Sequence, residues 1–224
     1  MKPVIGIVAR VEYPGETHKL VIGEDYRRSV IRYGGNPICI CPSFDIDYTI
    51  TKFTDQNELT NEEKEMLIKQ ISMCDGILMP GGFKVNKFDR FITEYATDND
   101  IPLLGICLGT QVMANYKKEK YWVEKNNSYI EHRIEDGVAH EVTLDMDSKL
   151  YSIIGKEKLM VNSRHYYHVL PNDYYEVTSI SDDNYIESIE MKNKKFNIGV
   201  QWHPESLDDE SSTKIFESFI DACK

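Results

Sequence analysis

A cysteine between two glycines is the side chain with the clearest chemical potential in this sequence. Cys107 lies in GICLG (105–109), where an apolar run ends and a helix-like stretch begins. A strand that turns sharply into a helix exposes the residue at its tip, and the first N–H groups of the helix favour the thiolate. Cys107 is therefore a candidate nucleophile. The alternative is a buried structural thiol at the end of a core strand.

A histidine and a glutamate two positions apart form the second candidate, in QWHPE (201–205). In extended chain, residues i and i+2 point to the same side, so His203 and Glu205 can lie together. The carboxylate would hold one imidazole nitrogen and leave the other for a thiol, which is the arrangement of nucleophile, base and orienting acid. A histidine in a surface loop is the alternative.

A pair of glycines, Gly81 and Gly82, follows the apolar run 76–79 and forms the third candidate. A backbone N–H of such a turn can point into a cleft and meet the N–H of Leu108, and two such donors make an oxyanion hole. The ends of neighbouring parallel strands share one crevice, which would bring the two turns together. The alternative is an ordinary strand–helix turn.

These candidates need a scaffold that brings three distant segments together, and the hydrophobic pattern predicts one. Four short apolar runs indicate strands buried on both faces, and spaced apolar residues between them indicate helices. Thr60 and Glu63 form the capping-box pattern of a helix start. Strands alternating with helices are typical of a parallel sheet. The expected strands are 3–9, 37–41, 76–79 and 102–107, and the expected helices are 24–33, 61–73 and 87–98.

The pattern changes after residue 116. The polar stretch 117–135 favours a surface excursion, and from His140 onward strand-like pieces follow one another. Turn residues at 182–184 and at Asn193 separate the later pieces, which indicates antiparallel hairpins. A helix over 211–223 is expected to close the chain. We predict a single α/β domain, residues 1–224, with a parallel sheet flanked by helices and an antiparallel C-terminal strand region.

Composition excludes several classes of protein. The 224 residues carry 26 Lys and Arg against 37 Asp and Glu, a net charge of −11, which argues against a nucleic-acid binder. The sequence has no run that approaches the ~18 apolar residues of a membrane helix, and the N-terminus favours a strand over a signal peptide. Five cysteines, an odd number, favour a reducing compartment, and we expect a cytoplasmic protein.

Three motifs together resemble the class I glutamine amidotransferase superfamily: PGG (80–82), GICLGTQ (105–111) and QWHPE (201–205). They occur in the order of that superfamily and at plausible separations. The resemblance implies a flavodoxin-like sheet with the nucleophile on a sharp strand–helix turn. It also implies roles for six residues: Cys107 as nucleophile, His203 as general base and acid, Glu205 orienting His203, Gly82 and Leu108 as the oxyanion hole, and Gln111 binding the amino-acid end of a glutamyl substrate.

The stretch 139–169 looks similar to a narrower branch, the gamma-glutamyl hydrolases related to gamma-glutamyl-gamma-aminobutyrate hydrolase. By this resemblance Ser163, Arg164 and His165 line the substrate cleft. The sequence departs from the branch at three positions that bear on the leaving group: Phe83-Lys84 replaces an expected aspartate, Leu108 an arginine and Tyr167 a glutamine. The identity of the leaving amine therefore stays open.

The predicted function is cysteine-dependent hydrolysis of the gamma-glutamyl amide bond in a small conjugate. A thioester intermediate forms on Cys107, and the products are glutamate and an amine. This chemistry needs no metal or organic cofactor. Two alternatives stay open: a glutaminase subunit that supplies ammonia to a partner synthetase, and a non-catalytic sensor or binding module. The sequence does not decide between a monomer and a homo-oligomer.

The spacing of the histidines bears on a possible zinc site. His165 and His168 are three residues apart. His140 and Glu141 precede them on the same stretch of chain, which does not by itself bring the side chains together. A zinc site needs three or four converging ligands, and the sequence has no H-E-x-x-H pattern. The sequence therefore predicts no metal site.

Overall fold

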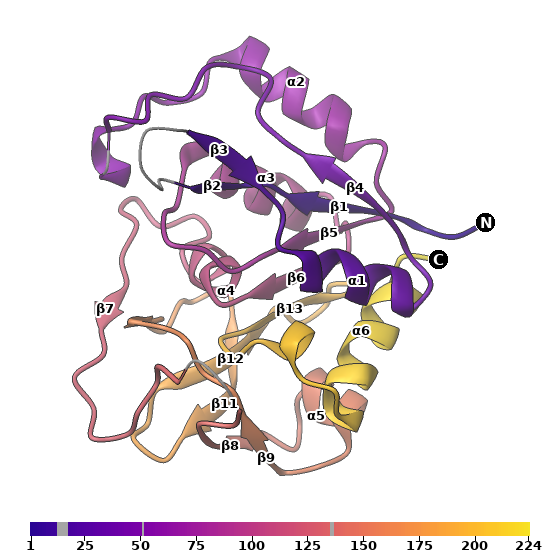
Figure 1. The fold of residues 1–224 in the computed structure, drawn as a ribbon, viewed down its shortest axis with the longest axis vertical. Coiled ribbons are helices and arrows are strands. Elements are labelled where there is room, and N and C mark those ends of the chain that lie inside the picture. Colours follow the sequence, from indigo (N-terminus) through magenta and orange to yellow (C-terminus); the bar gives the residue numbers. More distant parts are fainter. Residues whose placement is uncertain (13–17, 51, 135–136) are drawn as a thin grey trace.

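The computed structural model describes residues 1–12, 18–50, 52–134 and 137–224. Its centre is a nine-stranded sheet in the order β4-β1-β5-β6-β13-β12-β11-β8-β9 (Figure 1). The strands of the parallel half are β4 (Asn36–Ile40), β1 (Val4–Val8), β5 (Gly76–Met79), β6 (Leu103–Ile106) and β13 (Asn197–Val200). The remaining strands are β12 (Ile186–Glu190), β11 (Glu176–Ser181), β8 (His140–Leu144) and β9 (Lys158–Val161).

The parallel half confirms the predicted alternation of strands and helices. β1 pairs in parallel with β4 and β5, β5 pairs with β6, and β6 pairs with β13. One expectation is wrong, because β4 is the edge strand and is not buried on both faces. Cys39 on this strand is exposed, although its apolar neighbours predicted a core position.

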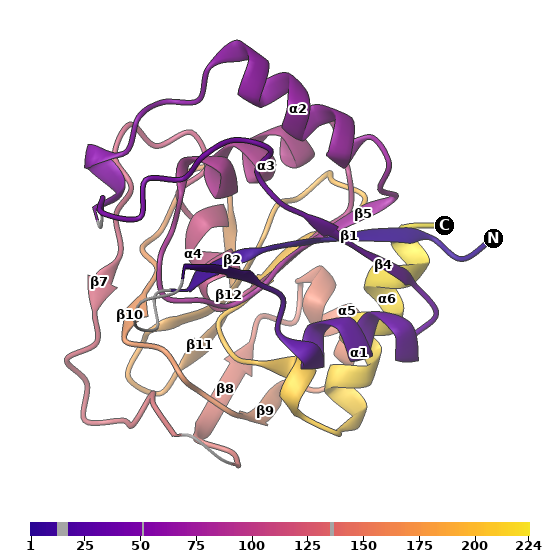
Figure 2. The same ribbon diagram turned by 45° about the horizontal axis from the view of Figure 1, so that its top comes forward.

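Helices cover both faces of the sheet, and each face has its own hydrophobic core (Figures 1 and 2). The expected capping box is present, because the Thr60 side chain accepts a hydrogen bond from the Glu63 N–H and the Glu63 carboxylate accepts one from the Thr60 N–H. One face carries α1 (Glu24–Arg32), α5 (Lys149–Ile154) and α6 (Glu210–Ala222). The other carries α2 (Asn61–Ile71), α3 (Lys87–Asp98) and α4 (Leu108–Met113).

The antiparallel half confirms the predicted hairpins. β11 pairs antiparallel with β12, and β12 pairs antiparallel with β13. Asn184 and Asn193 lie in the turns with φ of 64° and 66°, a left-handed conformation that asparagine tolerates better than most residues. Because β13 also pairs in parallel with β6, the chain returns its C-terminal segment to the middle of the sheet, beside the end of β6.

Two small sheets lie outside the main one. β2 (Arg10–Glu12) pairs with β3 (Lys19–Val21), and β7 (Glu124–Lys125) pairs with β10 (Tyr167–His168). The polar stretch 117–135 was predicted as an excursion, and its residue 135 lies outside the described residues. Residues 117–134 are largely an excursion, as predicted, but His132 is only 3% exposed. Over the described ranges, no helix is long and apolar enough to cross a membrane.

Candidate active site

Cys107 lies at the tip of a strained corner between β6 and α4. Its φ of 52° and ψ of −106° are unusual for a residue with a side chain, and such conformations cost about 1–3 kcal/mol and cluster at functional sites. Thr110 fixes the corner, since its hydroxyl donates to the carbonyl oxygens of Val200 at 2.6 Å and of Gly105 at 3.1 Å. A Cβ on Gly109 would lie 2.1 Å from the Met79 carbonyl oxygen, so only glycine allows α4 to pack this closely on β5.

His203 follows the end of β13 and pairs with Glu205. The distance from His203 Nδ1 to Glu205 Oε1 is 2.6 Å, and the side chains are 10% and 2% exposed. The pair forms through a short 3-10 helix, Pro204–Ser206, rather than through the extended chain that the spacing suggested. Asn162 holds the His203 backbone on both sides: its Oδ1 accepts from the His203 N–H at 2.8 Å, and its Nδ2 donates to the His203 carbonyl at 2.9 Å.

The thiol and the imidazole converge on Gly81. A Cβ built on this glycine would lie 3.0 Å from His203 Cε1 and 3.4 Å from Cys107 Cβ. Burial lowers the pKa of His203, but the negative charges of Glu205 and Cys107 act in the opposite direction and raise it to about 10. His203 Nε2 has no hydrogen-bond partner among the described residues, which leaves this nitrogen for proton transfer.

Tyr26 on α1 is a site residue that the sequence did not reveal. Its hydroxyl accepts a hydrogen bond from the Gly81 N–H at 3.0 Å and lies 3.4 Å from His203 Nδ1. Burial raises the pKa of Tyr26, and the charges of Glu205 and Cys107 raise it further, so the phenol stays protonated. In the sequence, Tyr26 is only an aromatic residue on an expected helix, a pattern typical of packing.

The turn that contains Gly82 packs against the start of α4. A Cβ on Gly82 would lie 3.2 Å from Leu108 Cδ2 and 3.0 Å from Arg10 Cδ. Leu108 begins α4, and the first N–H groups of a helix lack partners within it. Arg10, also missed in the sequence, fixes the turn: its Nε donates to the Pro80 carbonyl at 3.0 Å, and its guanidinium forms a buried ion pair with Asp89.

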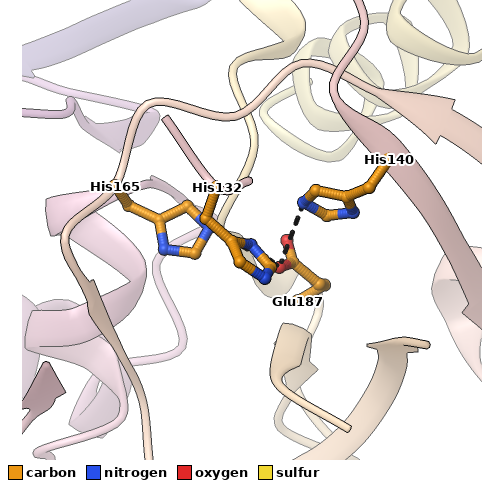
Figure 3. Close-up of side chains that lie close together, drawn as sticks. All are labelled: His132, His140, His165 and Glu187. Carbon is orange, nitrogen blue, oxygen red and sulfur yellow. Dashed lines mark ion pairs between the residues drawn. The ribbon is translucent and has the colours of Figure 1, made fainter. Parts of the chain in front are cut away.

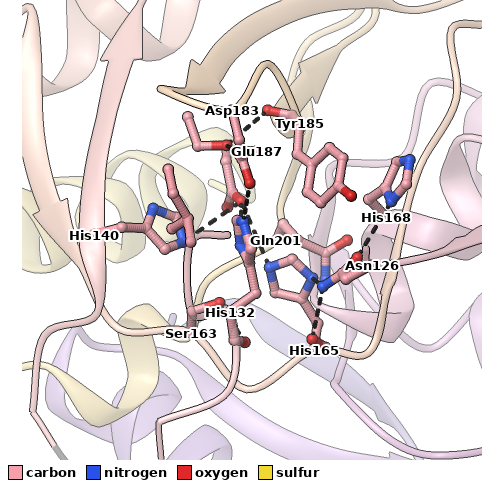
Figure 4. A network of polar contacts seen from close by, with 12 residues as sticks. Asn126, His132, His140, Ser163, His165, His168, Asp183, Tyr185, Glu187 and Gln201 are labelled. Atoms are coloured by element: carbon pink, nitrogen blue, oxygen red, sulfur yellow. Dashed lines mark hydrogen bonds and ion pairs between the residues drawn. The ribbon is translucent and has the colours of Figure 1, made fainter. Parts of the chain in front are cut away.

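The other predicted site residues are held by protein groups. Gln111 is buried, and its Nε2 lies 3.0 Å from the Tyr167 carbonyl oxygen. The Ser163 hydroxyl donates to the His132 carbonyl oxygen at 2.7 Å. Arg164 is exposed, with Nη1 3.3 Å from Ser206 Oγ beside the His203–Glu205 loop. His165 belongs to a buried polar network with His132 and Glu187 (Figure 4).

The fold and the site together define a class I glutamine amidotransferase-type domain, with a cysteine on a strand–helix corner and a His–Glu pair at the end of the adjacent strand. The sequence pattern of the Peptidase C26 family matches residues 84–205, more than half of the chain, and the chain belongs to that family.

Curated relatives include CTP synthases. The CTP synthase of Lactobacillus helveticus is 28% identical over 193 residues, which cover 71% of this chain and 36% of that protein. The CTP synthase of Lactobacillus johnsonii is 30% identical over 183 residues, which cover 66% and 34%. The chain thus spans about a third of the length of these relatives.

Solved structures show the same fold at low sequence identity. A protein from Thermoplasma acidophilum, named as a GMP synthase subunit, superposes with a TM-score of 0.68 at 15% identity, covering 99% of this chain and 94% of that one. The glutaminase domain of Trypanosoma brucei CTP synthase, with bound acivicin, gives 0.67 at 19% identity, covering 99% and 93%. These comparisons support the superfamily but not specifically the gamma-glutamyl hydrolase branch expected from the sequence.

Proposed function

We propose that this chain is a glutaminase that hydrolyses the side-chain amide of glutamine and supplies ammonia to a synthetase partner. The observation that carries the proposal is the convergence of Cys107 and the His203–Glu205 pair on Gly81. The comparisons support glutamine as the substrate, because the relatives are CTP synthases and one neighbour in fold is a glutaminase domain. They favour this alternative over hydrolysis of a conjugate such as gamma-glutamyl-4-aminobutyrate.

The proposed reaction runs through two acyl transfers. The Cys107 thiolate attacks the side-chain carbonyl carbon of glutamine, and the N–H groups of Gly82 and Leu108 receive the oxyanion. The C–N bond breaks as His203 gives its Nε2 proton to the nitrogen, so ammonia leaves and a glutamyl thioester remains. His203 then takes a proton from water, which attacks the thioester and releases glutamate and the thiolate. No metal or organic cofactor enters these steps.

Glu205 and Tyr26 position the histidine in this scheme. The carboxylate at 2.6 Å keeps the proton on Nδ1 and stabilises the imidazolium, so that Nε2 faces the reacting atoms. The Tyr26 hydroxyl links the Gly81 N–H to the same imidazole, which couples the glycine turn to the base. The raised pKa of His203, about 10, means that the imidazole is protonated when the thiolate is present.

The glutamate end of the substrate needs a cation for its α-carboxylate and acceptors for its α-ammonium. Arg164 is exposed beside the His203–Glu205 loop and is suited to the carboxylate by a charge-assisted hydrogen bond. We assign Gln111 and the Ser163–His165 segment to the same subsite on the strength of the superfamily resemblance. Their side chains are already held by protein groups, so backbone atoms of this segment are the expected contacts.

A direct test measures glutamate released from glutamine and from gamma-glutamyl-4-aminobutyrate, together with the mass of acid-quenched protein. We expect turnover of glutamine and a glutamyl adduct on Cys107. Cys107→Ser should abolish both, whereas the matched control Cys39→Ser, at an exposed position, should retain them. Full activity in Cys107→Ser would show that Cys107 is not the nucleophile. Turnover of the conjugate 100-fold above glutamine would restore the hydrolase interpretation.

A further inference from the structure

Three histidines and a glutamate converge in the interior, outside the proposed active site (Figure 3). His132 comes from the excursion after β7, His140 begins β8, His165 follows β9, and Glu187 lies in β12. Their exposed fractions are 3%, 6%, 3% and 0%. Four separate segments of the chain therefore bring imidazole and carboxylate groups, which bind transition metals, to one buried point.

The groups face one another as ion pairs whose separations are longer than those of close hydrogen bonds. Glu187 Oε1 lies 3.4 Å from His132 Nδ1, 3.6 Å from His140 Nε2 and 3.5 Å from His165 Nε2. These separations exceed the ~2.7–2.9 Å of charge-assisted hydrogen bonds. Among the residues that the structure describes, both Glu187 oxygens and all three of these nitrogens lack a hydrogen-bond partner. A buried carboxylate is costly unless a cation compensates it, and here that cation is either a protonated histidine or a metal ion.

The outer nitrogen of each histidine lies beside an oxygen acceptor, and Figure 4 shows that of His132, which is Asp183. An acceptor on the outside favours the proton on the outer nitrogen, so the inner nitrogen presents a lone pair to Glu187. Such outer partners are typical of metal-binding histidines. The three pairs are His132 Nε2 with Asp183 Oδ2 at 2.8 Å, His140 Nδ1 with the Glu141 carbonyl at 3.3 Å, and His165 Nδ1 with the Tyr167 carbonyl at 3.0 Å.

Asn126 completes the surroundings of His165. Its Nδ2 donates to the His165 carbonyl oxygen at 2.9 Å and lies 3.2 Å from His165 Nδ1. Its Oδ1 lies 3.2 Å from Nδ1 of His168, whose ring stacks on Tyr185 with the ring centres 3.9 Å apart. His168 therefore belongs to the neighbouring layer and is not one of the converging ligands.

We propose that His132, His140, His165 and Glu187 form a binding site for one Zn²⁺ ion. Zinc takes four nitrogen, oxygen or sulfur ligands at about 2.0–2.2 Å in a tetrahedron, whose ligand-to-ligand edges are then about 3.3–3.6 Å. The three nitrogen-to-oxygen distances match this edge. The four ligand atoms all lie within 4.8 Å of one another, so the nitrogen atoms would have to close to the same edge length when the ion binds. Four protein ligands in a buried position are characteristic of a structural site.

The site would stiffen the wall next to the catalytic histidine. His165 lies three residues after Asn162, which holds both sides of the His203 backbone. On the other side, the Glu187 carbonyl accepts a hydrogen bond from the N–H of Gln201 at 2.7 Å, two residues before His203. Zinc would hold these two segments in place. It would thereby fix the positions of His203 and of the Ser163–His165 segment, without itself contacting the substrate.

This proposal departs from the prediction made from the sequence, which was no metal site. Spacing drew attention to His140, Glu141, His165 and His168, which do not all converge, and so predicted no site. In the structure, His140 and His165 lie together with two other residues, His132 and Glu187. Neither addition has a recognisable spacing, because His132 comes from the polar excursion and Glu187 from a central strand.

The test is metal binding by the untagged chain, prepared both as wild type and as Cys107→Ser so that the nucleophile is not a ligand. We expect about one zinc per chain by elemental mass spectrometry, removable with a chelator. Zinc restored at about 100 times its dissociation constant should raise Tm by roughly 5–10 °C. Glu187→Gln and His140→Gln should bind zinc at least 10-fold more weakly, whereas His168→Gln should match wild type.

Two results would overturn the proposal. One is wild-type protein that neither contains zinc nor gains thermal stability when zinc is titrated to micromolar concentrations, which would leave a network bridged only by protons. The other is Glu187→Gln that folds and binds zinc as tightly as wild type. The wild-type titration stands even if a variant fails to fold. Metal content does not depend on turnover, so failure here leaves the proposed glutaminase reaction to its own test.

Discussion

Replacing Glu205 by glutamine removes a negative charge 2.6 Å from His203 Nδ1 while nearly preserving the shape of the side chain. The two side chains are 2% and 10% exposed, so water screens the pair little. A glutamine amide can also donate to Nδ1, which would place the imidazole proton on Nε2, the wrong tautomer for a base that faces the thiol.

The magnitude follows from the pKa of His203, which rises from 6.5 to about 10 although burial opposes the rise. At 1.36 kcal/mol for each pH unit, the imidazolium is stabilised by about 5 kcal/mol, shared between the charges of Glu205 and Cys107. We expect Glu205→Gln to lower the pKa of His203 by roughly 2 units or more and to reduce kcat by about 10²–10⁴-fold.

The assay combines the pH profile of glutamine hydrolysis with an NMR titration of the His203 imidazole in wild type and variant. Glu210→Gln is the matched control, because Glu210 lies at the exposed start of α6 and should change neither quantity. A Glu205→Gln enzyme within 10-fold of wild-type kcat, with His203 still titrating near 10, would refute the orienting role of this carboxylate.

Three further predictions concern stability and are checked by chemical denaturation. Gly109→Ala should lower the free energy of unfolding by about 1–3 kcal/mol and reduce turnover. The reason is that the new Cβ would lie 2.1 Å from the Met79 carbonyl oxygen and would push α4 away from β5. An unchanged midpoint of denaturation would contradict this packing. Arg10→Met should cost about 3–5 kcal/mol near neutral pH, since it leaves the Asp89 carboxylate buried without its cation. Burial already raises the pKa of Asp89 and Arg10 opposes that rise, so the loss should shrink as the pH falls and Asp89 protonates; a pH-independent loss would argue against a charge effect. Because the folded pKa of His203 is raised, its contribution to stability is complete below pH 6.5 and is lost as the pH rises toward about 10, a decline that His203→Gln should remove.

The strands and helices were predictable because each depends on residues close together in the chain. Residues 76–79 and 87–98 were expected as a strand and a helix, and the structure has β5 and α3 with those bounds. The capping box at Thr60 and the turn at Asn193 follow from local hydrogen bonding and backbone preference. Strand order does not follow from such local preferences, so only the structure showed that β4 is an edge strand.

The sequence also pointed to the chemical groups of the site, because Cys107, His203 and Glu205 lie in motifs with recognisable spacing. It did not identify Tyr26, Arg10 or Asn162. Each of these acts on a partner at least 41 positions away: Tyr26 on Gly81 and His203, Arg10 on Pro80, and Asn162 on His203.

The sequence by itself determined the α/β class of the chain and its superfamily, because hydrophobic period, glycine placement and short motifs are local properties of the polymer. Only the tertiary structure decided that β13 lies beside β6, which brings His203 to Cys107. Only the tertiary structure, likewise, brings His132, His140, His165 and Glu187 together in the interior. Contacts of this kind depend on how the whole sheet closes and on which buried charges can be compensated there, and no single stretch of residues contains that information.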